Sequence, residues 1–256
     1  MIIMEKEIVN FIKSKYHKKK YVPLHEPVFY GNEKKYINEC IDSTYVSSVG
    51  PFVDMFENMM NEITNTKKST AVVNGTAALQ VALRLVGVKK NDEVITQGLT
   101  FVATANSIMY NNAHPIFLDV DIDTMGLSAK SVKNFLEKNA EIRENGTYNK
   151  VSGRKISACL PMHTFGFPVH LDELIRVCKN WKIPLVEDSA ESIGSLYKNK
   201  PTGGFGKVAA FSFNGNKVVT AGAGGAITTN DIDLGKKAKH LTTTAKVPHK
   251  YKYIHN

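Results

Sequence analysis

Three stretches of the sequence place residues suited to chemistry directly after runs of apolar residues. Asn74-Gly75-Thr76-Ala77 follows an apolar stretch, Asp188 ends IPLVED, and Lys217 comes soon after VAAFSF. A turn that leads into a helix presents free backbone N–H groups and a threonine hydroxyl, which suits a phosphate. A buried carboxylate needs a cation or hydrogen-bond donors. Burial lowers the pKa of a lysine, and the neutral amine can attack a carbonyl to form a Schiff base.

Each of these features also has an ordinary structural interpretation. Asn and Thr are common helix caps, and an acid just past a strand can cap a helix or face solvent. Lysine is mostly a solvated residue. One ligand, however, uses all three groups together, because pyridoxal phosphate is held by its phosphate, its ring nitrogen and its aldehyde. The combination therefore predicts a pyridoxal phosphate site.

Apolar periodicity predicts the elements that position these groups. An amphipathic helix is expected from about Ile8 to Tyr16, ending in the lysines at 18–20, and a second around Tyr36 to Ile41. A third begins at Pro51, a residue suited to the first helical position. From Ser69 onward, strand and helix patterns alternate, and one of the predicted helices runs from residue 128 to residue 143.

Seven stretches have the length and apolar character of strands: STAVV, DEVIT, PIFLDV, KISACLP, IPLVED, VAAFSF and GAITT. Strands that are apolar throughout and separated by helices predict an α/β fold, with a seven-stranded, mostly parallel sheet between helices. A ligand of such a sheet binds at the carboxyl ends of the strands. The three chemically suited stretches follow three of these strands, so we expect them to meet at that edge.

Composition excludes several other classes of protein. The net charge of +9 comes from the two ends, because residues 1–25 carry +4 and residues 236–256 carry +6. A stripe of arginines with interleaved aromatic residues would indicate nucleic-acid binding, and the sequence has no such stripe. The three cysteines are too few and too scattered for a disulfide framework or a metal cluster. No apolar run is long enough to span a membrane. Taken together, these features lead us to expect a cytoplasmic protein with no bound metal and no membrane or nucleic-acid partner.

Several longer motifs occur in a characteristic order: NGTAAL, TFVATANSI, PMHTFG, VEDSAESIGS, SFNGNK and GAGGAITT. In these motifs the chain resembles the DegT/DnrJ/EryC1/StrS family, the sugar aminotransferases of the type I pyridoxal phosphate fold. The resemblance runs from about Tyr21 to the last residue. EPVFYGNE, SSVGPFVDMFE and SFNGNK look most like the branch that aminates nucleotide-linked keto sugars on the way to legionaminic-acid-type nonulosonates.

The resemblance implies roles for individual residues. Lys217 would bind the cofactor aldehyde and then move protons as general base and acid, while Asp188 would keep the pyridine nitrogen protonated. A lysine at position 217 argues against the family's sugar dehydratases, which have histidine there. His163 matches a histidine of the family's strand-end motif, and a place near the cofactor and a purely structural role are both open for it.

The resemblance also implies the remaining cofactor contacts. Gly75, Thr76 and Ala77 would hold the phosphate, and Ser212 would add its hydroxyl. Phe101 would stack on the ring face of the cofactor. Glu191 departs from the commoner pattern, in which glutamine or histidine lies beside the phenolic oxygen of the cofactor. A carboxylate there repels a phenolate unless one of the two is protonated.

The implied reaction transfers an amino group from an amino acid, with glutamate the expected donor, to a keto sugar carried on a nucleotide diphosphate. Such enzymes work in surface polysaccharide or nonulosonate biosynthesis, and we expect a homodimer. We predict an N-terminal amphipathic helix in residues 1–20 and a pyridoxal-phosphate-binding large domain of the aspartate-aminotransferase type in residues 21–245. Residues 246–256 would begin the connection to a small C-terminal domain that is largely missing. The alternative is an inactive truncated fragment that acts only as a binding or assembly partner.

Overall fold

The computed structural model describes residues 2–16, 19–247 and 254–255. The chain forms two compact units, residues 1–31 and residues 32–256. The first unit contains helix α1 (Ile2–Lys15), with Lys13 and Lys15 in its last turn. This helix ends before the predicted lysines at 18–20, and residues 17 and 18 lie outside the described residues. The predicted domain limits at residues 20 and 245 stay predictions.

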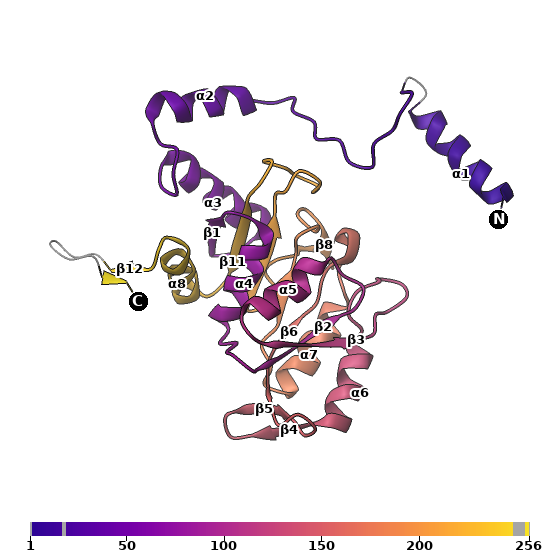
Figure 1. The fold of residues 1–256 in the computed structure, drawn as a ribbon, viewed down its shortest axis with the longest axis vertical. Helices are drawn as coiled ribbons and strands as arrows, with labels where there is room; N and C mark the ends of the chain where they lie inside the picture. The colour runs from indigo at the N-terminus through magenta and orange to yellow at the C-terminus, as the bar shows by residue number, and fades with distance from the viewer. Residues whose placement is uncertain (1, 17–18, 248–253, 256) are drawn as a thin grey trace. The chain divides into compact units, whose positions relative to one another are not determined.

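The second unit begins with two helices that the apolar pattern predicted, α2 (Glu33–Ser43) and α3 (Pro51–Thr64). Strands and helices then alternate (Figure 1). In chain order they are β1 (Lys68–Val72), α4 (Gly75–Leu85), β2 (Glu93–Gln97), α5 (Val102–Tyr110), β3 (His114–Leu118), α6 (Ala129–Asn139), β4 (Ala140–Arg143), β5 (Gly146–Asn149), β6 (Lys155–Leu160), the short 3₁₀ helix η1 (Thr164–Gly166), α7 (Leu171–Asn180), β7 (Val186–Asp188), β8 (Leu196–Tyr197), β9 (Lys200–Pro201), β10 (Val208–Ser212), β11 (Gly225–Thr229), α8 (Ile232–Thr242), β12 (Lys246–Val247) and β13 (Ile254–His255). Of the predicted 246–256 connection, residues 248–253 and 256 lie outside the described part.

The central β-structure consists of two sheets that meet at β6 and β7. One has the order β1-β11-β10-β7 and the other the order β3-β2-β6-β5-β4. Isolated parallel bridges from Cys159 to Leu185 and from Met162 to Asp188 connect them. The pairs β2–β3, β2–β6 and β7–β10 are parallel, whereas β11 is antiparallel to both of its neighbours. Each of the seven predicted stretches overlaps one of these strands.

One sequence prediction was wrong. The helix expected from residue 128 to residue 143 ends at Asn139, and residues 140–143 form β4, which pairs with β5 as a hairpin. Gly146 adopts a φ of +130° where the hairpin turns, a conformation that suits glycine. The four-residue strand is too short for its alternating pattern to be told apart from the last turn of a helix.

Helices cover both faces of the sheet. Neighbouring side chains of a strand point to opposite faces, so the two faces pack against different helices. In β10, Val208 and Ala210 belong to a core cluster that also contains residues of α4 and α8. Ala209 and Phe211 pack instead with Met60 of α3. A third cluster joins α6 and α7 to β2 and β6. This two-sided packing fixes the strands whose carboxyl ends position the site.

Candidate active site

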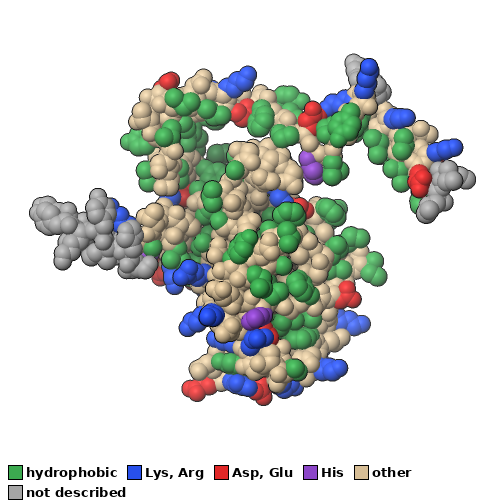
Figure 2. All heavy atoms as spheres, in the orientation of Figure 1, with side chains coloured by type: hydrophobic (Ala, Val, Ile, Leu, Met, Phe, Trp, Pro, Cys, Tyr) green, Lys and Arg blue, Asp and Glu red, His purple; other side chains and the backbone are tan. Residues whose placement is uncertain are grey.

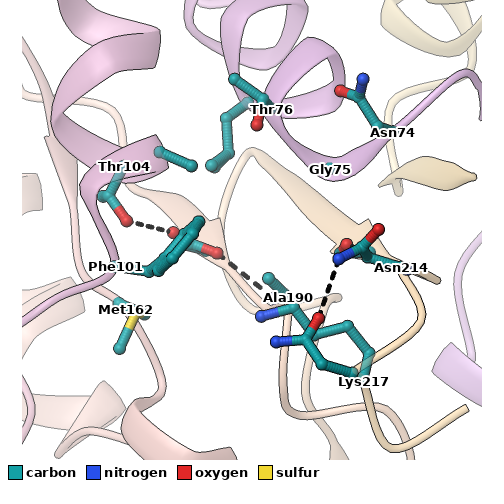
Figure 3. A pocket seen from close by; sticks show the side chains of 14 residues that line it. Asn74, Gly75, Thr76, Phe101, Thr104, Met162, Ala190, Asn214 and Lys217 are labelled. Carbon is teal, nitrogen blue, oxygen red and sulfur yellow. Dashed lines mark hydrogen bonds between the residues drawn. The ribbon is translucent and has the colours of Figure 1, made fainter. Parts of the chain in front are cut away.

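A cavity of about 250 Å³ opens at the carboxyl ends of the strands. It lies between the start of α4, the start of α5, the end of β7 and the turn that follows β10 (Figure 3). The lining residues are Asn74, Gly75, Thr76, Leu79, Phe101, Ala103, Thr104, Met162, Asp188, Ala190, Ser212, Asn214, Asn216 and Lys217. The structure therefore brings the three predicted chemical features together at one place.

The N-terminus of α4 forms one wall of this cavity. The side chain of Asn74 caps the helix by accepting a hydrogen bond from the Ala77 N–H at 2.8 Å. Gly75 and Thr76 occupy the first two helical positions, where N–H groups have no acceptor within the helix. A Cβ at Gly75 would lie 2.6 Å from the Cβ of Ser212, so only glycine lets the helix start approach β10 this closely. Ala77 was predicted to hold phosphate, but it is not among the lining residues and its N–H is taken by the cap.

Asp188 lies at the end of β7 and is almost completely buried. Its carboxylate accepts hydrogen bonds from the Thr104 hydroxyl at 2.7 Å and from the Ala190 N–H at 3.2 Å. Burial raises the pKa of Asp188 above its ordinary value, although these two hydrogen bonds and the charge of Lys217 act against the rise. The site thus contains a buried acid that a nearby cation would stabilise.

Lys217 follows β10 in a tight turn, and its side chain is 10% exposed. Its Nζ lies 3.0 Å from Oε1 of Glu191 and 5.6 Å from the ring centroid of Phe101. Phe101 directly precedes α5, lines the cavity and is 62% exposed. Glu191 is not among the residues that line the cavity, and it contacts the site through this ion pair with the lysine.

His163 has a structural role in this fold. Its buried ring accepts the Val169 N–H at Nδ1, at 3.3 Å, so Nε2 carries the proton toward the carboxylate of Glu187, at 3.2 Å. Burial raises the pKa of Glu187, but His163 and the N–H groups of Gly203 and Gly206 outweigh that effect and lower it overall. The histidine therefore connects the strand ends through contacts within the protein, and it is not among the residues that line the cavity.

Sequence reasoning did not single out several of the lining side chains, notably Thr104, Met162, Asn214 and Asn216. Thr104 lies one helical turn after Phe101 in the motif TFVATANSI, and this i, i+3 spacing places both residues on one helix face. The spacing could have identified Thr104 as a partner for the acid. Asn214 and Asn216 belong to the turn before Lys217, and their side chains bond to each other at 2.9 Å.

The family model for the DegT/DnrJ/EryC1/StrS aminotransferases matches residues 29–256. The chain belongs to this family. It is 40% identical over 232 residues to EpsN of Bacillus subtilis (strain 168), whose name places it among pyridoxal phosphate-dependent aminotransferases. It is 36% identical over 237 residues to the GDP-perosamine synthase of Escherichia coli O157:H7. These alignments cover 91% and 93% of this chain and 57% and 60% of the relatives.

Solved structures agree with this placement. The structure of DesI, determined in the presence of its TDP-sugar product, superposes with a TM-score of 0.74 at 27% identity. The match covers 86% of this chain and 52% of DesI. The fold is accordingly that of the fold type I pyridoxal phosphate aminotransferases, as the sequence predicted. The chain spans between half and three fifths of the length of these relatives.

Among the residues that the structure describes, no helix combines the length and the apolar character needed to cross a bilayer.

Proposed function

We propose that this chain forms the cofactor-binding part of a pyridoxal phosphate-dependent sugar aminotransferase. The reaction would transfer an amino group from an amino acid, glutamate in our proposal, to a keto sugar linked to a nucleotide diphosphate. Its product would enter surface polysaccharide or nonulosonate biosynthesis. One observation supports the proposal above all others: a lysine amine, a buried carboxylate and the first turn of helix α4 line one cavity.

The residues present fit the cofactor. The N–H groups at the start of α4 and the hydroxyls of Thr76 and Ser212 are suited to its phosphate, and the absence of a Cβ at Gly75 keeps that corner open. Asp188 carries the cost of burial without a cation in contact, and a protonated ring nitrogen would provide that cation. Phe101 has an exposed ring for stacking.

Bound pyridoxal phosphate supplies an aldehyde and a protonated ring that withdraws electrons from the substrate carbon. The protein would do the rest with its own groups. Asp188, held in place by Thr104 and the Ala190 N–H, would keep the ring nitrogen protonated. The amine of Lys217 would take a proton from the substrate carbon and return one, because its side chain reaches the cavity from the turn after β10. Glu191 would lie near the phenolic oxygen of the cofactor.

We further propose that the active form is a homodimer. Helices α2 and α3 carry exposed apolar side chains, including Ile37, Ile41 and Met59. Ile37 and Ile41 line an apolar groove together with Tyr36 and Phe52. Figure 2 shows hydrophobic side chains gathered over these two helices. Apolar surface of this extent favours association with another surface. The assignment to the legionaminic-acid branch, like the choice of nucleotide and sugar, stays a prediction.

The test is reduction with borohydride after incubation of the purified chain with pyridoxal phosphate, followed by peptide mapping of the labelled lysine. We expect label at Lys217 and much less label in the variant Asp188→Ala. Label spread over many surface lysines would show that the chain builds no cofactor site, and would favour the alternative of an inactive fragment that acts as an assembly partner. Amino transfer from glutamate to a nucleotide-linked keto sugar would then test the reaction itself.

A further inference from the structure

Glu191 holds two different groups with its two carboxylate oxygens. Oε1 pairs with the Nζ of Lys217 at 3.0 Å, and Oε2 accepts the backbone N–H of Phe165 at 3.1 Å. The side chain of Glu191 is 25% exposed, so solvent screens these contacts only in part. The carboxylate therefore links the reactive amine to a backbone turn that lies 26 residues before Glu191 in the sequence.

That turn has an unusual conformation. Phe165 interrupts η1 with a φ of 52° and a ψ of 24°, in the left-handed region that bulky residues rarely occupy. Gly166 follows at a φ of +85°, and a Cβ there would lie 2.9 Å from the carbonyl oxygen of Glu191. Glu191 thus contacts the turn with its side chain and packs against it with its main chain. Phe165 and Phe167 are 75% and 65% exposed.

We propose that Glu191 is a positioning residue that couples the charge of the Lys217 amine to the conformation of the 163–167 turn. While the amine is charged, the carboxylate stays between the ammonium and the Phe165 N–H. When the amine loses its charge, the carboxylate keeps only one donor in a partly desolvated place and turns toward water. Phe165 then loses the hydrogen bond that holds it in the left-handed region, and the turn is released.

The other charged groups near the amine do not provide the same link. Asp188 acts on Lys217 through its charge, but its oxygens are bonded to Thr104 and to the Ala190 N–H. His163 begins the turn, yet its ring is committed to Glu187. Among the described contacts, the carboxylate of Glu191 is the group that touches both the amine and the turn. The coupling rests on the proposed function only in taking Lys217 as the reactive amine.

The first arm of the test measures the amine in the full, cofactor-free chain. Competitive acetylation at pH 8, read out by mass spectrometry of the peptide that contains Lys217, reports how much neutral amine is present. We expect Glu191→Gln to raise this labelling, because the variant removes the carboxylate that binds the amine at 3.0 Å. Glu173→Gln removes an exposed acid of α7 and is the matched control, for which we expect no change.

The second arm measures the turn by hydrogen exchange of the Phe165 amide, the donor in the proposed link. At one fixed pH, we expect Lys217→Met and Glu191→Ala each to speed exchange about tenfold, and the double variant to be no faster than Glu191→Ala alone. Glu191→Gln keeps an acceptor for this amide and lacks the charge, so it should retain most of the protection. This variant separates the two contacts even if Glu191→Ala folds poorly.

Unchanged acetylation in Glu191→Gln, or unchanged exchange of the Phe165 amide in Lys217→Met, would overturn the coupling. Additive effects in the double variant would do the same. None of these measurements needs transaminase activity or cofactor. Scattered label in the borohydride experiment would therefore count against the proposed function and leave the coupling to be decided by these two arms.

Discussion

Replacing Asp188 by asparagine should change the stability of the cofactor-free chain and its affinity for the cofactor in opposite directions. A buried carboxylate costs several kcal/mol to desolvate, and each hydrogen bond to a charged group returns about 1.5–3 kcal/mol. Asp188 accepts two such bonds, yet its pKa is raised, so the desolvation cost exceeds the return. We expect Asp188→Asn to increase the free energy of unfolding at pH 8, by less than the several kcal/mol that the desolvation itself costs.

The sign of the pH dependence follows from the raised pKa. The folded chain binds a proton at Asp188 more readily than the unfolded chain does, so the penalty is present at a pH above the folded pKa. As the pH falls through the folded pKa toward the ordinary value of 3.8, the folded carboxyl takes up its proton and the penalty disappears. The stability difference between Asp188→Asn and the wild-type chain should therefore be largest at pH 8 and shrink in acid.

Urea unfolding followed by the fluorescence of Trp181, the single tryptophan, measures this difference at each pH. The control is Asp42→Asn, which alters an exposed acid of α2 and should change little at any pH. Pyridoxal phosphate binding, measured by absorbance, should weaken at least tenfold in Asp188→Asn, because the ring nitrogen loses its anionic partner. A variant that is less stable without cofactor, or that binds the cofactor as tightly as the wild type, would refute the reasoning.

Three further changes test the surroundings of the site. Gly75→Ala puts a Cβ 2.6 Å from the Cβ of Ser212. We expect cofactor affinity to fall at least tenfold in a binding titration and the free energy of unfolding to fall by about 1–3 kcal/mol. Normal affinity would contradict the proposed role of Gly75 at the phosphate site. Asn74→Ala removes the cap of α4 and should lower the free energy of unfolding, measured with urea, by about 1 kcal/mol. Glu187→Gln puts an amide donor among N–H donors and should lower the free energy of unfolding by about 3 kcal/mol. Because the pKa of Glu187 is lowered, wild-type stability should fall as the pH drops through that pKa, and the Gln variant should lose this part of the acid sensitivity.

Much of the fold and of the site follows from local patterns. Apolar strands separated by amphipathic helices determine an α/β sheet, and such a sheet presents its strand ends along one edge. Lys217, Asp188 and the start of α4 could be placed at this edge because each comes after a recognisable strand. The β4–β5 hairpin was not predictable in this way, since four residues cannot establish a period.

The sequence by itself determined the fold class, the family and three of the features that meet at the cavity, namely Lys217, Asp188 and the start of α4, because these depend on composition, periodicity and motif order along the chain. Only the tertiary structure decided what each side chain contacts. It turned His163 toward Glu187 and away from the cavity, and it placed Glu191 between Lys217 and the Phe165 N–H. Such partners are far apart in sequence and meet through strand pairing and through the alternation of side chains between the two faces of the sheet, which a one-dimensional pattern does not specify.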